Sequence, residues 1–150
     1  MTPSRPVQQL LGILDQAYDK RSWHGTNLRG SIRGVSAGQA SWRPEPARHN
    51  IWEIVVHAAY WKYAVWRRLT GQPRGSFPLK GSDWFRRPED AGERAWREDK
   101  ALLDQMHRSL REAVATRRDV RASDTFLISG AAAHDVYHAG QIQLLKRLHR

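Results

Sequence analysis

The feature that most constrains the fold is an apolar stripe with helical spacing near the end of the chain. Positions along residues 131–148 repeat at intervals of 3, 4, 3, 4 and 3, which is the a/d spacing of a helix packed in a bundle. The stripe consists of Ala131, His134, His138, Gln141, Leu145 and Leu148, with Leu127 one turn upstream. It predicts a long helix in which two histidines take core positions.

His134 and His138 lie four residues apart, so both imidazoles project from one helix face, about 6 Å apart along the axis. A buried imidazole must satisfy its ring nitrogens, and a shared metal ion is one way for two neighbours to do so. Two hydrogen-bonded core histidines, or a helix turned so that both face solvent, would fit the same spacing. Zinc proteases have Glu after the first His. Here Asp135 takes that place, and we expect it to be solvated or salt-bridged.

The composition limits the chemistry. At 150 residues and 17.3 kDa the chain is expected to be a single domain, residues 1–150, with a substantial core. It has no cysteine, which excludes disulfides, cysteine nucleophiles and thiolate ligands, so any metal must be bound by nitrogen and oxygen. The first residues do not resemble a secretory leader, and no apolar run reaches about 18 residues. We therefore expect a cytoplasmic protein without a membrane segment.

The formal charge is +10, from 25 Lys and Arg against 15 Asp and Glu. The basic residues are spread over every segment instead of one face, and no zinc-finger, RNP or helix-turn-helix motif stands out. We therefore expect no specific nucleic-acid partner, and only weak adhesion to polyanions at low salt.

Four helical segments and no strand are predicted, which favours an all-α four-helix bundle. The segments are residues 6–33, expected to bend or break at Gly25 and Gly30, residues 50–70, opened by an Asn50/Glu53 capping box, residues 91–118, and a last helix capped by Ser123-Asp124. Residues 36–49 form a polar connector that its prolines keep from being helical. The Gly-, Pro- and aromatic-rich connector 72–88 is long enough to cover one end of the bundle as a lid.

A third metal ligand should come from another helix. His57 is the best candidate, because it lies at the edge of the apolar stripe in the helix over residues 50–70. His24 is the second candidate, because it is in phase with apolar residues of the first helix. The other histidines are better explained as surface or structural residues.

Three segments carry a resemblance to a known family: His57-Ala-Ala-Tyr-Trp-Lys, the turn Gly75-Ser-Phe-Pro78, and His134-Asp-Val-Tyr-His-Ala-Gly-Gln141. With these segments the chain resembles the DinB-like, or YfiT-like, metal-binding four-helix bundles. The resemblance extends over nearly the whole chain, from Trp23-His-Gly-Thr-Asn27 and Trp42-Arg-Pro to the last helix. By that similarity the metal ligands would be His57, His134 and His138, and the ion would be nickel or zinc. Members with known activity are mostly thiol S-transferases or thiol-dependent isomerases, related proteins include hydrolases, and many members are homodimers.

Such a site would leave one coordination position open on a divalent ion, and a bound water or thiol would lose its proton more easily there. Any low-molecular-weight thiol must come from solution, because the chain has no cysteine. Gln141 is a candidate to support the metal water or a ligand's ring N–H, unless it is a satisfied core amide. His24 is a candidate general acid or base, unless it is a packed core histidine. The remaining candidates are Trp23, Trp42, Trp61 and Trp84 for an apolar pocket, and Arg21 and Arg68 for steering an anionic thiol.

Three hypotheses remain at this point. The first is a metal-dependent enzyme of the thiol S-transferase or hydrolase type, acting on a small molecule. The second is a metal- or ligand-binding bundle without catalysis. The third is a structural bundle that dimerises through an apolar helix face, in which the histidines are simply packed.

Overall fold

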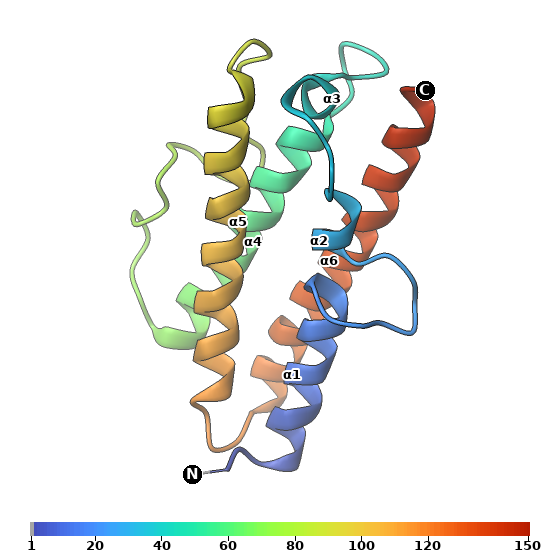
Figure 1. The fold of residues 1–150 in the computed structure, drawn as a ribbon. Coiled ribbons are helices and arrows are strands. Elements are labelled where there is room, and N and C mark those ends of the chain that lie inside the picture. Colours follow the sequence, from blue (N-terminus) through green and yellow to red (C-terminus); the bar gives the residue numbers. More distant parts are fainter. Residues whose placement is uncertain (1) are drawn as a thin grey trace.

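The computed structural model describes residues 2–150, which form six helices and no strand. The helices are α1 (Arg5–Tyr18), α2 (Leu28–Ser31), α3 (Ala37–Ser41), α4 (Ile51–Thr70), α5 (Gly92–Ala115) and α6 (Ala122–Leu148). Figure 1 shows the long helices α1, α4, α5 and α6 side by side, with α2 and α3 in the connection from α1 to α4. Helices α1 and α4 each pack against both α5 and α6. The predicted all-α class is confirmed.

The helix predicted over residues 6–33 breaks around Gly25, as predicted, but not at Gly30, which lies inside α2. α1 ends at Tyr18, and the connection that follows contains Gly25 with a φ of 104°. A side chain is rarely accommodated at such a φ, and a helix cannot continue through it. The chain becomes helical again at α2, where the Asn27 side chain accepts from the Gly30 N–H at 2.9 Å.

The connector predicted over residues 36–49 is partly helical. The Ser36 hydroxyl accepts from the Gln39 N–H at 3.1 Å and caps the five-residue helix α3. The prediction of a non-helical segment is therefore wrong for Ala37–Ser41. It holds for the Pro-containing stretch that follows, because α3 ends before Trp42-Arg-Pro.

α6 differs from its prediction in its start and in its buried face. Its N-cap is Arg121, and Asp124 is the N3 residue that accepts from the Arg121 N–H at 3.3 Å. The buried residues are Asp124, Ile128, Ala131, Ala132, Asp135, His138, Ala139, Ile142 and Leu145. The stripe is thus rotated from the predicted one, so that His134 and Gln141 are half-buried and Leu148 is 55% exposed. The rotation places His134 at the edge of the core.

α4 is the most buried helix of the described residues. Every residue from Ile51 to Ala59 is buried, because α3, α5 and α6 all pack against this helix. His57 therefore projects from a helix that is enclosed on several sides. Among residues 2–150, no helix combines the length and apolar character that a membrane-spanning segment needs.

Candidate metal centre

The start of α4 is fixed by the predicted capping box. Asn50 Oδ1 accepts from the Glu53 N–H at 2.8 Å, and Glu53 Oε1 accepts from the Asn50 N–H at 3.1 Å. Glu53 Oε1 also accepts from Arg43 Nη1 at 2.8 Å. The capping prediction is confirmed. Glu53 lies one turn before His57 on α4, but its carboxylate is bonded to Asn50 and Arg43, so other residues orient His57.

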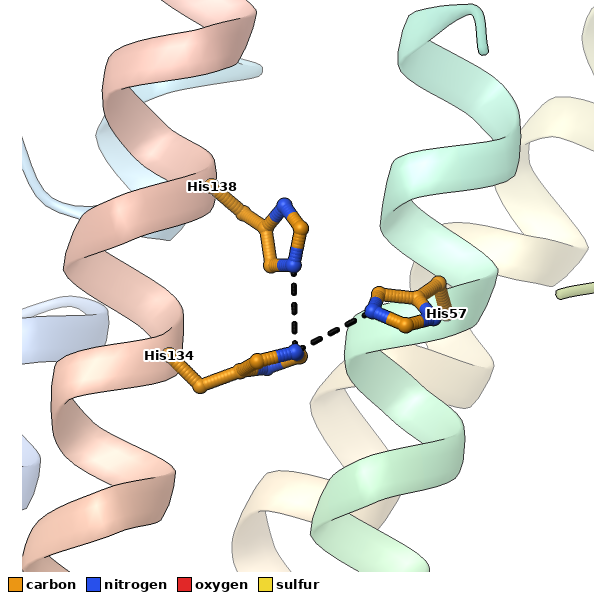
Figure 2. A group of neighbouring side chains, drawn as sticks. All are labelled: His57, His134 and His138. Carbon is orange, nitrogen blue, oxygen red and sulfur yellow. Dashed lines mark hydrogen bonds between the residues drawn. The ribbon is translucent and has the colours of Figure 1, made fainter. Parts of the chain in front are cut away.

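Three histidines from two helices meet in the seam between α4 and α6. Figure 2 shows His57 of α4 and His134 and His138 of α6 pointing toward one another. His134 Nε2 lies 3.1 Å from His57 Nε2 and 3.0 Å from His138 Nε2. A ligand nitrogen from each ring lies within 4.8 Å of the other two. The structure therefore brings together the three residues that the family resemblance suggested as ligands.

The outer nitrogens of two of these rings are bonded to oxygen acceptors. His57 Nδ1 lies 2.7 Å from the Asp83 carbonyl oxygen, and His138 Nδ1 lies 2.7 Å from Gln141 Oε1. The Gln141 amide is oriented by Tyr137, whose hydroxyl accepts from Gln141 Nε2 at 3.3 Å. A carbonyl oxygen only accepts, so Nδ1 donates in both rings and each Nε2 carries a lone pair.

The three-histidine cluster lacks one proton or cation that its Nε2 lone pairs could share. Lone pairs on His57 and His138 both face His134 Nε2, which carries at most one proton, so one of the two contacts has no proton to share. Burial lowers the pKa of His134 to about 3 and the pKa of His138 to about 4, and it lowers the pKa of His57 as well. The three rings are therefore neutral at neutral pH, which is the form that binds a metal ion.

A divalent ion fits this arrangement. The Nε2 atoms of His57 and His138 lie 3.1 and 3.0 Å from His134 Nε2, so the three rings would present their lone pairs to one ion, and imidazole nitrogen is a common ligand of divalent transition metals. The Nδ1–H groups of His57 and His138 are already held by a carbonyl oxygen, which is the usual support for a metal-bound imidazole. His57 and His138 are buried and His134 is half-buried, so the site approaches solvent on the His134 side.

A second group with suitable ligand atoms, Asp15, Asp19 and His107, suits a metal less well. Asp15 already accepts from Arg111 at 2.7 and 2.9 Å. Burial, and then the positive charge of Lys62 and Arg111, lower the pKa of His107 to about 2. A divalent cation placed there would add to that positive charge, so we take the three-histidine cluster as the candidate metal centre.

The aromatic connector over residues 72–88 contributes directly to this centre. The Trp84 ring lies between two imidazoles, 3.8 Å from His57 and 3.5 Å from His49 between ring centroids, with interplanar angles of 7° and 2°. The preceding residue, Asp83, supplies the carbonyl that holds His57 and is the one non-glycine residue of 2–150 with positive φ, at 67°. Asp tolerates this conformation better than most residues. The connector thus covers one side of His57.

The remaining sequence candidates divide into two groups. His24 is exposed, bonded to the Gln16 carbonyl at 3.1 Å and outside the three-histidine group, so its predicted core position is wrong. Trp23 is 96% exposed and does not line a pocket near the histidines, because the break after α1 puts both residues on a surface loop. Trp61 does line a pocket beside His134. The structure also places Gln141 against His138, as stated above.

A buried ion pair beside the histidines was missed from the sequence. Lys62 and Asp135 are each 1% exposed, and Lys62 Nζ donates to Asp135 Oδ2 and, at 3.2 Å, to His107 Nδ1. Of the two expectations for Asp135, the salt bridge is found and solvation is not. Desolvation raises the pKa of Asp135 to about 6. The signal in the sequence was Lys62 four residues after buried Ala58, in a helix with almost no polar face.

A groove of about 470 Å³ runs between α4 and α6 from His134 toward the end of α4. We call it the α4/α6 groove. Its lining residues are Trp61, Lys62, Val65, Arg68, Phe126, Leu127, Ser129, Gly130, Ala131, Ala133 and His134. The half-buried side of the candidate metal centre therefore opens onto a largely apolar cavity.

Comparison with known proteins gives one match. A family model described as the DinB superfamily matches residues 21–144. No curated protein and no solved structure matches the chain. The matched segment contains all three histidines, the 72–88 connector and Gln141.

Proposed function

The chain belongs to the DinB superfamily, and from this premise we propose that it is a metal-dependent enzyme. His57, His134 and His138 hold a divalent transition ion, nickel or zinc, and the reaction is the transfer of a small thiol or the hydrolysis of a small molecule. We also propose that the long helices form the family's four-helix bundle. The exposed apolar residues Tyr137, Leu144 and Leu148 on α6 suit a homodimer.

The observation that carries this proposal is the convergence of three neutral Nε2 atoms with too few protons between them. Packed histidines without an ion would leave two lone pairs facing each other across about 3 Å, which is unfavourable in a buried site. An ion satisfies all three nitrogens at once.

When bound, a divalent ion with three neutral imidazole ligands lowers the pKa of a water or thiol at its open position by several units. The chain's own residues position and protect the site. The Asp83 carbonyl and Gln141 Oε1 hold the two outer N–H groups and so fix the ring orientations. Trp84 covers the flat face of His57 and keeps water from that side.

The first experiment is elemental analysis of untagged protein beside the His57→Ala, His134→Ala and His138→Ala variants. About one nickel or zinc ion per chain, lost in all three variants, supports the site. His24→Ala is the matched control, because it removes an exposed histidine outside the cluster and should keep the ion. No ion in the wild-type protein, even after equilibration with divalent metals, would favour the structural bundle.

The second experiment separates catalysis from binding. Metal-loaded protein is screened with low-molecular-weight thiols against electrophilic carbon centres, and with esters and amides in the absence of thiol. Turnover above the His138→Ala background in the first set indicates a transferase, and in the second set a hydrolase. A tightly bound ion without turnover in either set would favour the non-catalytic binding bundle.

A further inference from the structure

Part of the α4/α6 groove lies between small residues of α6 and large residues of α4, and Phe126 and Leu127 of α6 complete the lining. Ser129, Gly130 and Ala133 line one wall, and Trp61 and Val65 line the other. A Cβ added at Gly130 would meet no heavy atom within 4 Å. Glycine in a helix interior is less stable than alanine, so Gly130 lowers helix stability at a position where it leaves space open.

One wall of the groove is held in place by the candidate metal centre. Trp61 Nε1 donates to Asp83 Oδ1 at 2.8 Å, and the Asp83 carbonyl accepts from His57. The Trp61 ring lies 6.5 Å from the His134 ring between centroids. The same residue therefore fixes a metal-ligand candidate and the aromatic wall, so the groove is pre-formed next to the site.

The charges of the groove are of one sign. Within residues 2–150 its lining includes no carboxylate, and its two cations are Lys62 and Arg68. The Lys62 ammonium is already paired with Asp135. Arg68 is exposed and, in the part of the chain that the structure describes, has no salt-bridge partner. An apolar cavity with one free guanidinium is complementary to an apolar molecule with one anionic group.

We propose that the α4/α6 groove binds an amphipathic carboxylate, which deepens and rests on the proposed function by naming its substrate class. The carboxylate pairs with Arg68, the apolar body lies between Trp61 and the small residues of α6, and the opposite end reaches the His134 side of the metal centre. Trp61 and Arg68 are seven residues apart on α4, so the apolar body is about 10 Å long.

The test is calorimetric titration of the full chain with octanoate, octan-1-ol and octylammonium, which share one apolar chain. It is made first on metal-free protein, where a carboxylate has no ion to bind, and then with one equivalent of Zn²⁺. We expect one octanoate per chain, bound at least about tenfold more tightly than octan-1-ol, because a charge-assisted hydrogen bond to Arg68 is stronger than a neutral one. Octylammonium should bind most weakly.

Two pairs of variants locate the binding. Gly130→Leu fills the groove while improving the helix propensity of α6, and it should abolish octanoate binding. Gly12→Leu makes the same change inside α1, where a Cβ also meets nothing within 4 Å, and should leave binding unchanged. Arg68→Gln should reduce octanoate affinity about tenfold without affecting octan-1-ol. Arg67→Gln removes the same charge from the neighbouring position, which lines a different pocket, and should have little effect.

Several results would overturn the proposal. Equal affinity for octanoate and octan-1-ol, equal loss in Arg67→Gln and Arg68→Gln, or unchanged binding in Gly130→Leu would each do so. A fourth result would also overturn it: the wild-type protein binds no octanoate, and light scattering shows a wild-type dimer that Gly130→Leu disrupts. The groove would then be an interface between two copies of the chain. Octanoate binding by metal-free protein does not depend on the ion. A failure of the proposed metal function would therefore leave that result intact, and a failure of the groove would leave the metal analysis intact.

Discussion

Two polar clusters lie next to each other where α4 packs against α6, one of them also including His107 of α5, and they differ in where the positive charge comes from. His134 and Asp135 are neighbours in sequence, and His57 and Lys62 are five residues apart on α4. In the Lys62/Asp135/His107 cluster the Lys62 ammonium is itself the cation, and both partners receive hydrogen bonds from it. In the His57/His134/His138 cluster the described residues supply three neutral nitrogens and no cation. The first cluster therefore contains its own cation, although Asp135 Oδ1 and His107 Nε2 have no hydrogen-bond partner among the described residues. The second cluster gains a cation only when an ion binds.

The largest expected effect comes from breaking the Lys62/Asp135/His107 cluster. Lys62→Met leaves the Asp135 carboxylate buried without its partner, which should lower the free energy of unfolding by about 3–5 kcal/mol. Urea denaturation of metal-free protein measures this loss.

The matched control for that prediction removes both charges. Lys62→Met combined with Asp135→Leu should regain most of the lost stability, because no unpaired charge remains in the interior. A single variant within about 1 kcal/mol of wild type would mean that water or another group satisfies Asp135, and the contrast between the two clusters would weaken.

The second effect comes from adding an ion to the His57/His134/His138 cluster. Zn²⁺ at about one hundred times its dissociation constant should raise the free energy of unfolding by about 2.7 kcal/mol, because the ion binds the folded chain and not the unfolded one. Denaturation curves with and without the ion measure the increment. His138→Ala should lose it and His24→Ala should keep it. An increment of equal size in both variants would place the ion elsewhere in the protein.

The comparison also shows what could be predicted from the sequence. The helical class, the capping box at Asn50 and the pairing of His134 with His138 follow from local spacing, which depends on residues a few positions apart. The prediction of His57 as the third ligand rests on the family resemblance and on its place at the edge of an apolar stripe. The meeting of His57 with His134 and His138 depends on how α4 and α6 pack, and no local pattern specifies that.

The missed features depend on contacts between distant segments. The Asp83 carbonyl is a backbone group, so no side-chain motif marks it as the acceptor for His57. The sequence alone predicts that Lys62 faces solvent. In the structure it is buried between His107 of α5 and Asp135 of α6. The orientation of α6 was predicted about the His134 stripe, whereas the Ile128, Asp135 and Ile142 repeat faces the core. From the sequence, Asp135 is expected to be solvated or salt-bridged. It can be buried because the Lys62 ammonium pairs with it.

The third effect tests the support of one imidazole. Gln141→Leu leaves His138 Nδ1–H without its acceptor, which should weaken Zn²⁺ binding about 10–100-fold, equivalent to about 1.4–2.7 kcal/mol. Competition with a chromophoric chelator measures the affinity. Gln143→Leu makes the same substitution two residues along α6, where the side chain contacts Lys146, and should leave the affinity unchanged. Equal loss in both variants would indicate a general effect on the helix.

The smallest effect is a pH dependence that arises from the Lys62/Asp135/His107 cluster. Burial, and then the charges of Lys62 and Arg111, lower the pKa of His107 to about 2, against about 6.5 in an unfolded chain. Above pH 6.5 His107 is largely neutral in both states and does not lower the free energy of unfolding. Below pH 6.5 the unfolded chain binds a proton at His107 and the folded chain does not, so the free energy of unfolding decreases as the pH falls. Between pH 7 and pH 5.5 the loss from His107 should be about 1.3 kcal/mol.

His107→Gln isolates this contribution, because glutamine keeps an acceptor for Lys62 and does not titrate in this range. Urea denaturation of metal-free wild-type and variant protein at the two pH values should show a loss smaller by about 1.3 kcal/mol in the variant. The other buried histidines titrate in both proteins and cancel in the difference. Equal losses would show that His107 is protonated in the folded state. Its nitrogen would then compete with Lys62 for Asp135 instead of accepting from Lys62, and the cluster would carry one positive charge more than the structure implies.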